Sequence, residues 1–472
     1  MKLKQFKALF LCALFSGSSL SAVDLPDNAS VIPPGTVKPF VEGDRIAFLG
    51  DSITSGGTYH KYIYTYWITR HPNIKITQMN KGIFSDFVTG GIGRMDFDVL
   101  KEKPNKVAID YGMNDSGASH RADLFGMENP SDEVLSKRKE WVAKFRQNIE
   151  QLIAILKERN ITPILIGASI YDNTMVRDGL NRIGANSGIE ACVRELKDLS
   201  KKNGYEFVDF NKPMLLANAS LQKNDPKSTI VGGDRVHPES PGHWLMATSF
   251  LKAQNATPYV AKFTIDASQK TITTLENCNI DNLKSKDSAI VFDYFPNSLP
   301  LPFNNDYKKA CHIVPITDEL NQEIIRVIGL KEGKYSLTID ELLIGTYSLA
   351  DFATGINIAL ADNNPGQKQA KLLDSLVQER YTHEGHIRML RQADCRYGKR
   401  FLAGEREKII AEFKVKLEEA TLAKKAYEIG SLTTYLKNII QEETMNKRIL
   451  EIENEIYLKN KPQKHVVRID YL

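Results

Sequence analysis

The chain has 472 residues, of which 42% are apolar and 25% are charged, and its formal net charge is +4. This is the composition of a globular protein long enough for two or three domains, and it argues against intrinsic disorder. Because the charge is small and the lysines are spread along the chain, nothing indicates a nucleic-acid partner.

The N-terminal segment is typical of an export signal. Three lysines in MKLKQFK precede the apolar run ALFLCALFSG, and small residues follow in SSLSAVD. This order predicts a secretory signal peptide over residues 1–22, and therefore a periplasmic or extracellular protein, with an N-terminal helix of the fold as the alternative. Cys12 is followed by further apolar residues, which argues against a lipoprotein anchor. No later segment has the roughly 20 apolar residues of a transmembrane helix.

Four cysteines follow the predicted signal peptide, without CxxC spacing and without a neighbouring histidine pair: Cys192, Cys278, Cys311 and Cys395. This spacing predicts no zinc site. In an oxidising compartment an even number of cysteines permits disulfides, and Cys278 and Cys311, which flank a predicted β-region, are the best candidates for a pair. Buried free thiols are the alternative.

Short apolar runs alternate with longer helical stretches from residue 45 to about residue 255. The predicted strands are RIAFLG, IKITQMN, KVAIDYG, ITPILIGASI and YEFVDF, and the clearest helix carries Phe145, Ile149, Leu152 and Leu156 on one face. This alternation predicts β-α-β units and a doubly wound parallel sheet, in which ligands bind beyond the carboxyl ends of the strands.

The pattern changes near residue 256. Runs such as YVAKFTID and AIVFDYF predict a small β-rich domain over residues 256–350. Long, charged amphipathic segments predict a helical C-terminal region over residues 351–472, and their charges are interpreted as a solvated face.

A serine directly follows the first predicted strand in RIAFLGDSITSGG. Ser52 therefore lies at the carboxyl edge of the sheet, where its hydroxyl can cap the next helix or act as a nucleophile. A nucleophile needs a base, and Asp234 and His237 in GGDRVHPESPGHW are spaced so that the carboxylate can orient the imidazole. These residues together predict a Ser-His-Asp triad.

An oxyanion formed at Ser52 needs hydrogen-bond donors at the same edge of the sheet. Gly82 follows the second predicted strand in QMNKGIFSD, and because it has no Cβ a reacting carbonyl can approach its N–H closely. Asn114 follows the third strand in AIDYGMNDSG and offers its side-chain amide, and the N–H of Ser52 is the third predicted donor.

In these residues the chain resembles the SGNH hydrolases, the GDSL-type esterases. FLGDSIT, NKGIFSD, YGMND and DRVHP match the family's four blocks in order over about residues 43–255, with isoleucine in place of leucine after GDS. The resemblance implies a flavodoxin-like α/β catalytic domain and no metal or cofactor. It implies Ser52, Asp234 and His237 as the triad, and Ser52, Gly82 and Asn114 as the oxyanion donors.

The sequence therefore predicts an exported serine esterase that forms an acyl-enzyme on Ser52. The resemblance implies that the substrate is a carboxylic ester, above all an acetyl ester, of a small molecule or a polysaccharide. A lipase or thioesterase is the nearest alternative, and an inactive polysaccharide-binding or scaffold protein is an alternative of another class. Because all the residues assigned to chemistry lie between Ser52 and His237, a chain ending near residue 260 is expected to keep its activity on small esters.

Overall fold

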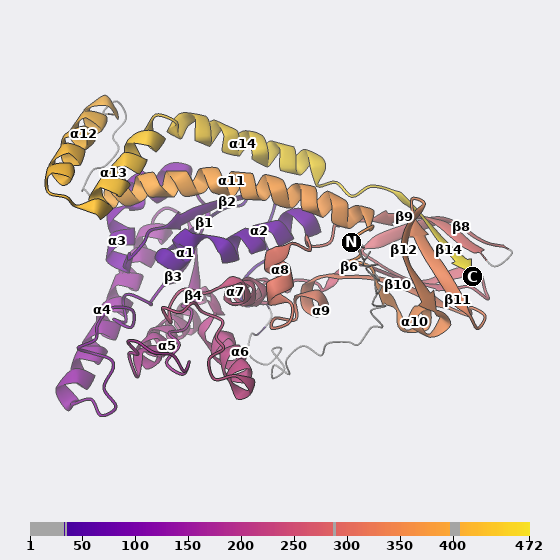
Figure 1. The fold of residues 1–472 in the computed structure, drawn as a ribbon, viewed down its shortest axis with the longest axis horizontal. Coiled ribbons are helices and arrows are strands. Elements are labelled where there is room, and N and C mark those ends of the chain that lie inside the picture. The colour runs from indigo at the N-terminus through magenta and orange to yellow at the C-terminus, as the bar shows by residue number, and fades with distance from the viewer. Residues whose placement is uncertain (1–32, 34, 287–288, 397–405) are drawn as a thin grey trace, which may run out of the picture.

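The computed structural model describes residue 33 and residues 35–286, 289–396 and 406–472. The predicted signal peptide, residues 1–22, lies outside the described residues. Figure 1 shows an α/β unit, a β-rich part beside it, and C-terminal helices that run back over the α/β unit. Within these ranges no helix is both long enough and apolar enough to cross a membrane.

A five-stranded parallel sheet forms the centre of the α/β unit. Its strands are β1 (Arg45–Gly50), β2 (Thr77–Gly82), β3 (Lys106–Tyr111), β4 (Thr162–Gly167) and β5 (Glu206–Asp209), in the order β2-β1-β3-β4-β5. This is the flavodoxin-like doubly wound order that the resemblance implied. From their second residue on, β1 to β4 are buried throughout, because helices cover both faces of the sheet.

Two apolar cores lie on the two faces of this sheet. The helices of the unit are α1 (Ser52–Gly56), α2 (Thr58–Arg70), α3 (Val88–Gly93), α4 (Asp132–Lys157), α5 (Ala185–Asn203), α6 (Asn211–Asn224) and α7 (Ser240–Ala253), with a π-helical turn at Met95–Val99 and a 3-10 turn at Leu100–Glu102. The predicted helix is α4, and its buried residues include the four that the apolar spacing predicted.

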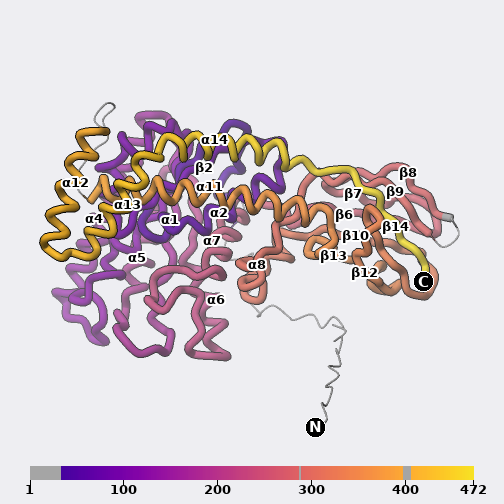
Figure 2. The backbone as a smooth tube through the Cα atoms, turned by 45° about the horizontal axis from the view of Figure 1, so that its top comes forward, coloured from indigo at the N-terminus to yellow at the C-terminus, as the bar shows by residue number. Residues whose placement is uncertain are grey.

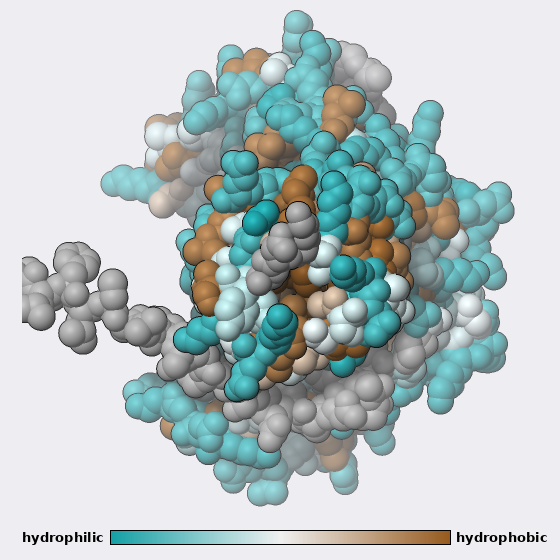
Figure 3. Space-filling view, turned by 90° about the vertical axis from the view of Figure 1, so that its right-hand side faces the viewer, coloured by the Kyte–Doolittle hydropathy of each residue, from teal (hydrophilic) through white to brown (hydrophobic). Residues whose placement is uncertain are grey.

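The β-rich part consists of two sheets that enclose a third apolar core. The first has the order β13-β10-β6-β7, from β6 (Tyr259–Asp266), β7 (Thr271–Glu276), β10 (Gln322–Ile328) and β13 (Ile356–Asn357). The second has the order β12-β11-β14-β9-β8, from β8 (Cys278–Lys286), β9 (Ala289–Pro296), β11 (Lys334–Ile339), β12 (Leu342–Ser348) and β14 (His465–Tyr471). Short helices α8 (Asn305–Ala310), α9 (Ile316–Leu320) and α10 (Leu349–Thr354) connect them. Seen end on, apolar side chains show at the centre of this part within a hydrophilic surround (Figure 3).

Strand β14 differs from the expectation of helix throughout residues 351–472. It lies between β11 and β9 and pairs with both. His465, Val467 and Ile469 are buried while Val466 and Arg468 are exposed, which is the period-two pattern of a strand with one face on a core.

The expected disulfide between Cys278 and Cys311 is wrong, because all four cysteines of the described ranges are free thiols. Cys278 begins β8, where its thiol lies 3.7 Å from Lys262 O, whereas Cys311 follows α8 and its thiol lies 3.5 Å from Lys308 O.

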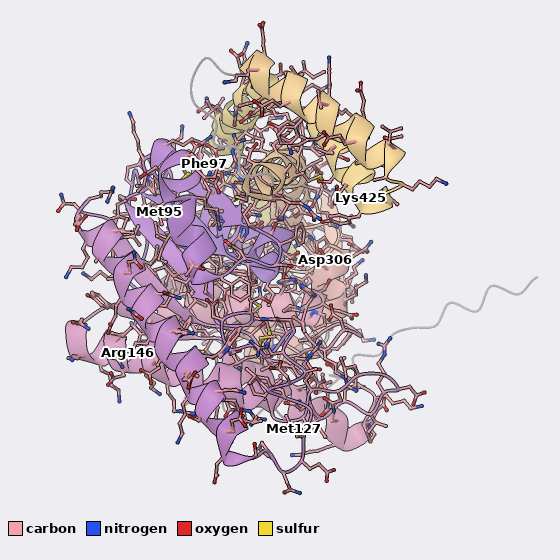
Figure 4. All side chains as sticks on the ribbon, turned by 90° about the vertical axis from the view of Figure 1, so that its left-hand side faces the viewer. Met95, Phe97, Met127, Arg146, Asp306 and Lys425 are labelled. Carbon is pink, nitrogen blue, oxygen red and sulfur yellow. The ribbon has the colours of Figure 1, made fainter. Side chains whose placement is uncertain are left out.

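The C-terminal helices are α11 (Pro365–Arg396), α12 (Arg406–Leu422), α13 (Ala426–Ile439) and α14 (Glu442–Lys459). Helices α11 and α14 run side by side along the α/β unit, over α2 and β2 (Figures 1 and 2). Figure 4 looks from the opposite end to Figure 3, with Met95 and Phe97 marking the segment after β2 and Lys425 marking the junction of α12 and α13. The α12–α13 pair has a small apolar core of its own with the end of α11.

Helix α11 covers the open edge of β2, which is the outermost strand of the parallel sheet. Side chains four residues apart on α11 bind backbone groups two residues apart on β2 and the loop after it: Arg380 donates to Gln78 O, Glu384 Oε1 accepts from Asn80 N at 2.8 Å, Arg388 Nε donates to Gly82 O at 3.1 Å, and Gln392 Oε1 accepts from Phe84 N at 2.8 Å. The two repeats match because four helical residues rise about 6 Å and two strand residues about 6.6 Å.

Some charges of these helices are buried, so interpreting all of them as a solvated face is wrong. Glu442 and Glu453 of α14 are 8% and 4% exposed. Glu442 pairs with Arg391 and Glu453 pairs with Arg380, both on α11. Ion pairs between two amphipathic helices thus occupy positions that a single-helix pattern assigns to solvent.

Asp98 anchors α11 to the segment after β2. It is fully buried, and Arg388 Nη1 and Nη2 lie 2.6 and 2.7 Å from its two carboxylate oxygens. Arg94 Nη1 lies 2.6 Å from Asp98 Oδ2, and Lys81 Nζ lies 3.7 Å from Oδ1. Burial favours the neutral carboxyl, but the three cations outweigh it and hold the pKa of Asp98 well below its ordinary value.

We expect Asp98→Asn to lower the free energy of unfolding at pH 7 by about 3–5 kcal/mol, because it leaves buried cations without their partner. A carboxyl whose pKa is lowered by folding stabilises the fold above its unfolded pKa of about 4 and loses this contribution as the pH falls further. The difference between the variant and the wild type should therefore shrink below about pH 4. Urea unfolding of both proteins from pH 3 to 7 measures this difference in the free energy of unfolding.

The matched control is Asp123→Asn, which removes an exposed carboxylate paired with Arg121. No measurable change in stability is expected from it at any of these pH values. An Asp98→Asn variant as stable as the wild type at pH 7 would contradict the role assigned to this anchor.

Candidate active site

Ser52 is the first residue of α1 and directly follows Asp51 at the end of β1. Asp51, not Ser52, caps this helix, since its Oδ1 accepts from Ile53 N at 2.9 Å. The alternative interpretation of Ser52 as a helix cap is therefore wrong. Its Oγ instead lies 2.8 Å from His237 Nε2.

Asp234 and His237 come together in the loop before α7. Asp234 Oδ1 accepts from the N–H groups of Val236 and His237, both at 3.0 Å, and its Oδ2 lies 2.5 Å from His237 Nδ1. Since a carboxylate only accepts, Nδ1 carries the proton and Nε2 presents its lone pair to the Ser52 hydroxyl. Burial raises the pKa of Asp234, but these hydrogen bonds outweigh it and leave the pKa below its ordinary value. The sequence-predicted triad residues thus lie within hydrogen-bond reach in the order Ser52, His237, Asp234.

Arg235 holds this loop in place, and sequence reasoning missed it. Its φ is 68°, in the left-handed region, and its buried guanidinium donates to the carbonyls of Asp172, Met175 and Arg177 at 3.0 to 3.1 Å. In return Asp172 N donates to Arg235 O at 2.9 Å. The loop that carries the histidine is therefore tied to the loop after β4.

The structure contradicts the prediction that Gly82 N–H is an oxyanion donor. Gly82 is the last residue of β2, and its N–H already donates to Asn80 Oδ1 at 2.9 Å. A Cβ at Gly82 would collide with the backbone of Ser55. The glycine is needed because β2 and α1 pack closely here, and this packing, not an open N–H, explains the residue.

Asn114 follows β3 and faces the loop after β2. Its Nδ2 donates to Asp86 O at 2.9 Å and lies 3.5 Å from Asp51 Oδ2, while its Oδ1 accepts from Ser119 Oγ at 2.6 Å. One N–H of the amide is thus held by the carbonyl of Asp86. The other has only the 3.5 Å contact with Asp51, the residue before Ser52.

Three buried carboxyl groups lie at or just beyond the ends of β1 and β3. Burial and the nearby Asp110 hold the pKa of Asp51 well above its ordinary value. Burial raises the pKa of Asp110 to about 6 and that of Asp115 to about 7. Because raised pKa values mean less ionisation at neutral pH, these groups add less negative charge to this edge of the sheet than three ordinary carboxylates would.

The site is open to solvent. The side chains of His237 and Asp234 are 49% and 52% exposed. A cavity of about 580 Å³ lies beside their loop, lined by residues that include Arg177, Lys227 and Gly233. Within the described ranges no group of three or more His, Cys, Asp and Glu side chains is arranged to hold a metal ion.

Comparisons with known proteins find a family and a relative for the α/β unit. The model of the GDSL-like lipase/acylhydrolase family matches residues 48–245. The acetylxylan esterase of Geobacillus stearothermophilus is 24% identical over 225 residues, which cover 44% of this chain and 93% of the esterase. Its crystal structure has a TM-score of 0.36 at 23% identity, over 45% of this chain and 95% of that chain.

The solved structure of a gut microbial diltiazem-metabolizing enzyme matches far more of the chain. Its TM-score is 0.83 at 31% sequence identity, over 93% of this chain and 99% of that chain. The match therefore includes the β-rich part and the C-terminal helices as well as the α/β unit. With the family model over the α/β unit, it follows that the chain is a carboxylic ester hydrolase and belongs to the GDSL-like lipase/acylhydrolase family.

Proposed function

We propose that this protein is an exported serine esterase that removes acyl groups, above all acetyl groups, from carbohydrates. The observation that carries the catalytic part is the run of contacts from Ser52 Oγ to His237 Nε2 at 2.8 Å and from His237 Nδ1 to Asp234 Oδ2 at 2.5 Å. An imidazole held in this way can take the serine proton and later return it to the leaving alcohol.

In the proposed reaction Ser52 Oγ attacks the ester carbonyl carbon while His237 takes its proton. The tetrahedral oxyanion is stabilised by the N–H of Ser52 and by the less firmly held N–H of the Asn114 amide. The alcohol leaves with the proton from His237, and water then hydrolyses the acyl-enzyme with His237 again as base.

A carbohydrate ester as substrate is supported by two observations. The α/β unit aligns with an acetylxylan esterase over 93% of that protein's length. The base is half exposed, which leaves room for a bulky alcohol part.

A second candidate substrate class is small drug-like esters, which the diltiazem-metabolizing relative favours because it matches nearly the whole chain. Purified protein incubated with acetylated xylo-oligosaccharides, diltiazem and p-nitrophenyl esters of increasing acyl length separates the two classes. The proposal expects the highest kcat/KM on acetylated sugars. Preference for long acyl chains would favour a lipase. Failure of a fluorophosphonate probe to label the protein would favour an inactive scaffold.

Export is proposed from the sequence of residues 1–22. Its test is mass spectrometry of the N-terminal peptide of the protein recovered from the cell envelope or the medium. A mature N-terminus close to Ala22 or Val23 is expected, and an intact Met1 in the cytosol would contradict export.

We expect Asn114→Ala to lower kcat by about 10²–10³-fold, with a smaller effect on KM, because the oxyanion exists only in the transition state. Steady-state kinetics on p-nitrophenyl acetate measure both constants. A change confined to KM would instead make Asn114 a substrate-binding residue.

A further inference from the structure

A chain of charged groups joins α11 to Asn114. Arg388 binds both carboxylate oxygens of Asp98 at 2.6 and 2.7 Å, and Asp98 Oδ2 accepts from Arg94 Nη1 at 2.6 Å. Arg94 Nε and Nη2 donate to Asp86 Oδ2 at 3.1 and 2.9 Å. The backbone carbonyl of Asp86 then accepts from Asn114 Nδ2 at 2.9 Å. Each residue in this chain contacts the next directly.

The members of this chain are buried. The side chains of Arg388, Arg94 and Asp98 are 3%, 2% and 0% exposed, and that of Asp86 is 9% exposed. Tyr111 OH also donates to Asp86 Oδ2 at 2.8 Å. Moving any member away from its partner would leave a charge unpaired in the interior, so the chain favours one arrangement.

Helix α11 also holds the start of the loop that contains Asp86. Arg388 Nε donates to Gly82 O at 3.1 Å. Phe84 lies two residues after Gly82, and its N–H donates to Gln392 Oε1 at 2.8 Å. Gln392 Nε2 lies 3.5 Å from Phe84 O. Ser85 then turns the chain with a φ of 58° before Asp86. The loop that presents a carbonyl to Asn114 is thus fixed by side chains some three hundred positions later in the sequence.

We propose that Arg388 is a positioning residue for ester hydrolysis, which sets the direction of the Asn114 amide through Asp98, Arg94 and Asp86. The inference rests on the proposed role of Asn114 as an oxyanion donor. A donor must lie within a few tenths of an ångström of its best place to stabilise a transition state fully, so loosening the carbonyl that holds it reduces kcat. The second half of the chain then contributes to the reaction without touching the substrate.

The test compares Arg388→Met with Arg380→Met on the full chain. Both residues are buried on the same face of α11 and both bind a β2 carbonyl, Gly82 O and Gln78 O respectively. The contacts of Arg388 lead to Asn114, whereas Arg380 pairs with Glu453 and with Glu384, which accepts from Asn80 N. Arg388→Met is expected to lower kcat by about 10- to 100-fold with KM changed less than about threefold, and Arg380→Met to leave kcat within about twofold.

A loss of kcat must be distinguished from a loss of folding. Circular dichroism and thermal melts set an assay temperature at which both variants are folded. Arg388→Lys keeps the buried charge but loses the paired N–H geometry, and it provides a folded variant with a kcat between those of the wild type and Arg388→Met. If both Met variants lose kcat equally, or if the Arg388 variants fold and keep the wild-type kcat, the positioning role is overturned.

A double-variant cycle shows whether the effect passes through Asn114. In an Asn114→Ala background, Arg388→Met should lower kcat by less than about twofold, because the group that it positions is gone. Full additivity of the two effects would overturn the inference while the esterase proposal stands. If Ser52→Ala keeps the activity of the wild type, the proposed function itself fails, whatever the Arg388 variants do.

Discussion

Ser52→Ala is expected to lower kcat on p-nitrophenyl acetate by about 10⁶-fold, to the level left by the other groups of the site. The variant removes the hydroxyl that is proposed to form the acyl-enzyme, and with it the proton that His237 would accept. The fold should persist, because Asp51 and not Ser52 caps α1. Steady-state assays measure the loss of kcat, and circular dichroism checks that the variant is folded.

Ser55→Ala is the matched control, since Ser55 lies three residues later in α1 and its contact with Asn80 uses only the backbone carbonyl. It should keep kcat within about twofold, because Ser55 is half-buried and the substitution keeps its backbone contact with Asn80. Fluorophosphonate labelling adds a readout that is independent of substrate choice. If Ser52→Ala were labelled as fast as the wild type, another residue would be the nucleophile.

A chain that ends near residue 260 is expected to be insoluble or unfolded and therefore inactive. This reverses the expectation from sequence, which placed all the chemistry before residue 255 and treated that unit as self-sufficient. The apolar core on the α2 and α7 face of the sheet continues into the second half through twelve buried side chains: Leu299, Leu301, Tyr307, Ala310, Val314, Ile316, Leu320, Leu373, Leu376, Val377, Ile452 and Ile456.

The size of this effect follows from burial. A fully buried aliphatic or aromatic side chain contributes about 1.5–3 kcal/mol, whereas a whole domain is stable by only about 5–15 kcal/mol. Truncation also exposes the β2 edge and leaves Asp98 without Arg388. Expression of the truncated and full chains side by side, followed by gel filtration, circular dichroism and the p-nitrophenyl acetate assay, tests it. A folded, monomeric truncated protein with kcat within about tenfold of the full chain would contradict the expectation.

The residues at the strand ends could be predicted because local patterns determine them. An uninterrupted apolar run predicts a buried parallel strand, and the first polar residue after it lies at the carboxyl edge of the sheet. Ser52 and Asn114 were found in this way, and the spacing of Asp234 and His237 within one loop is also local. Helix α4 was predicted from its apolar periodicity, whereas the flavodoxin-like order of the strands was implied by the resemblance.

Gly82 shows where this reasoning fails. A glycine after a strand looks the same in sequence whether its N–H is open or bound, and here the side chain of Asn80 binds it. The contacts of α11 with β2 could not be predicted from the sequence, for another reason. Arg388 and Gln392 are ordinary residues of a charged amphipathic helix, and only tertiary packing brings them to Gly82 O and Phe84 N. Long-range pairings of this kind leave no local pattern.

The position of β14 has a consequence for the order in which the parts of the protein can fold. The strand lies in the middle of its sheet, between β11 and β9, yet it is made after all four C-terminal helices. Until residues 465–471 take their place, β9 and β11 have no strand between them with which to pair. Completing that sheet requires residues 465–471, so chains stalled before them would keep two unpaired strand edges, a feature that quality-control proteases and chaperones can recognise.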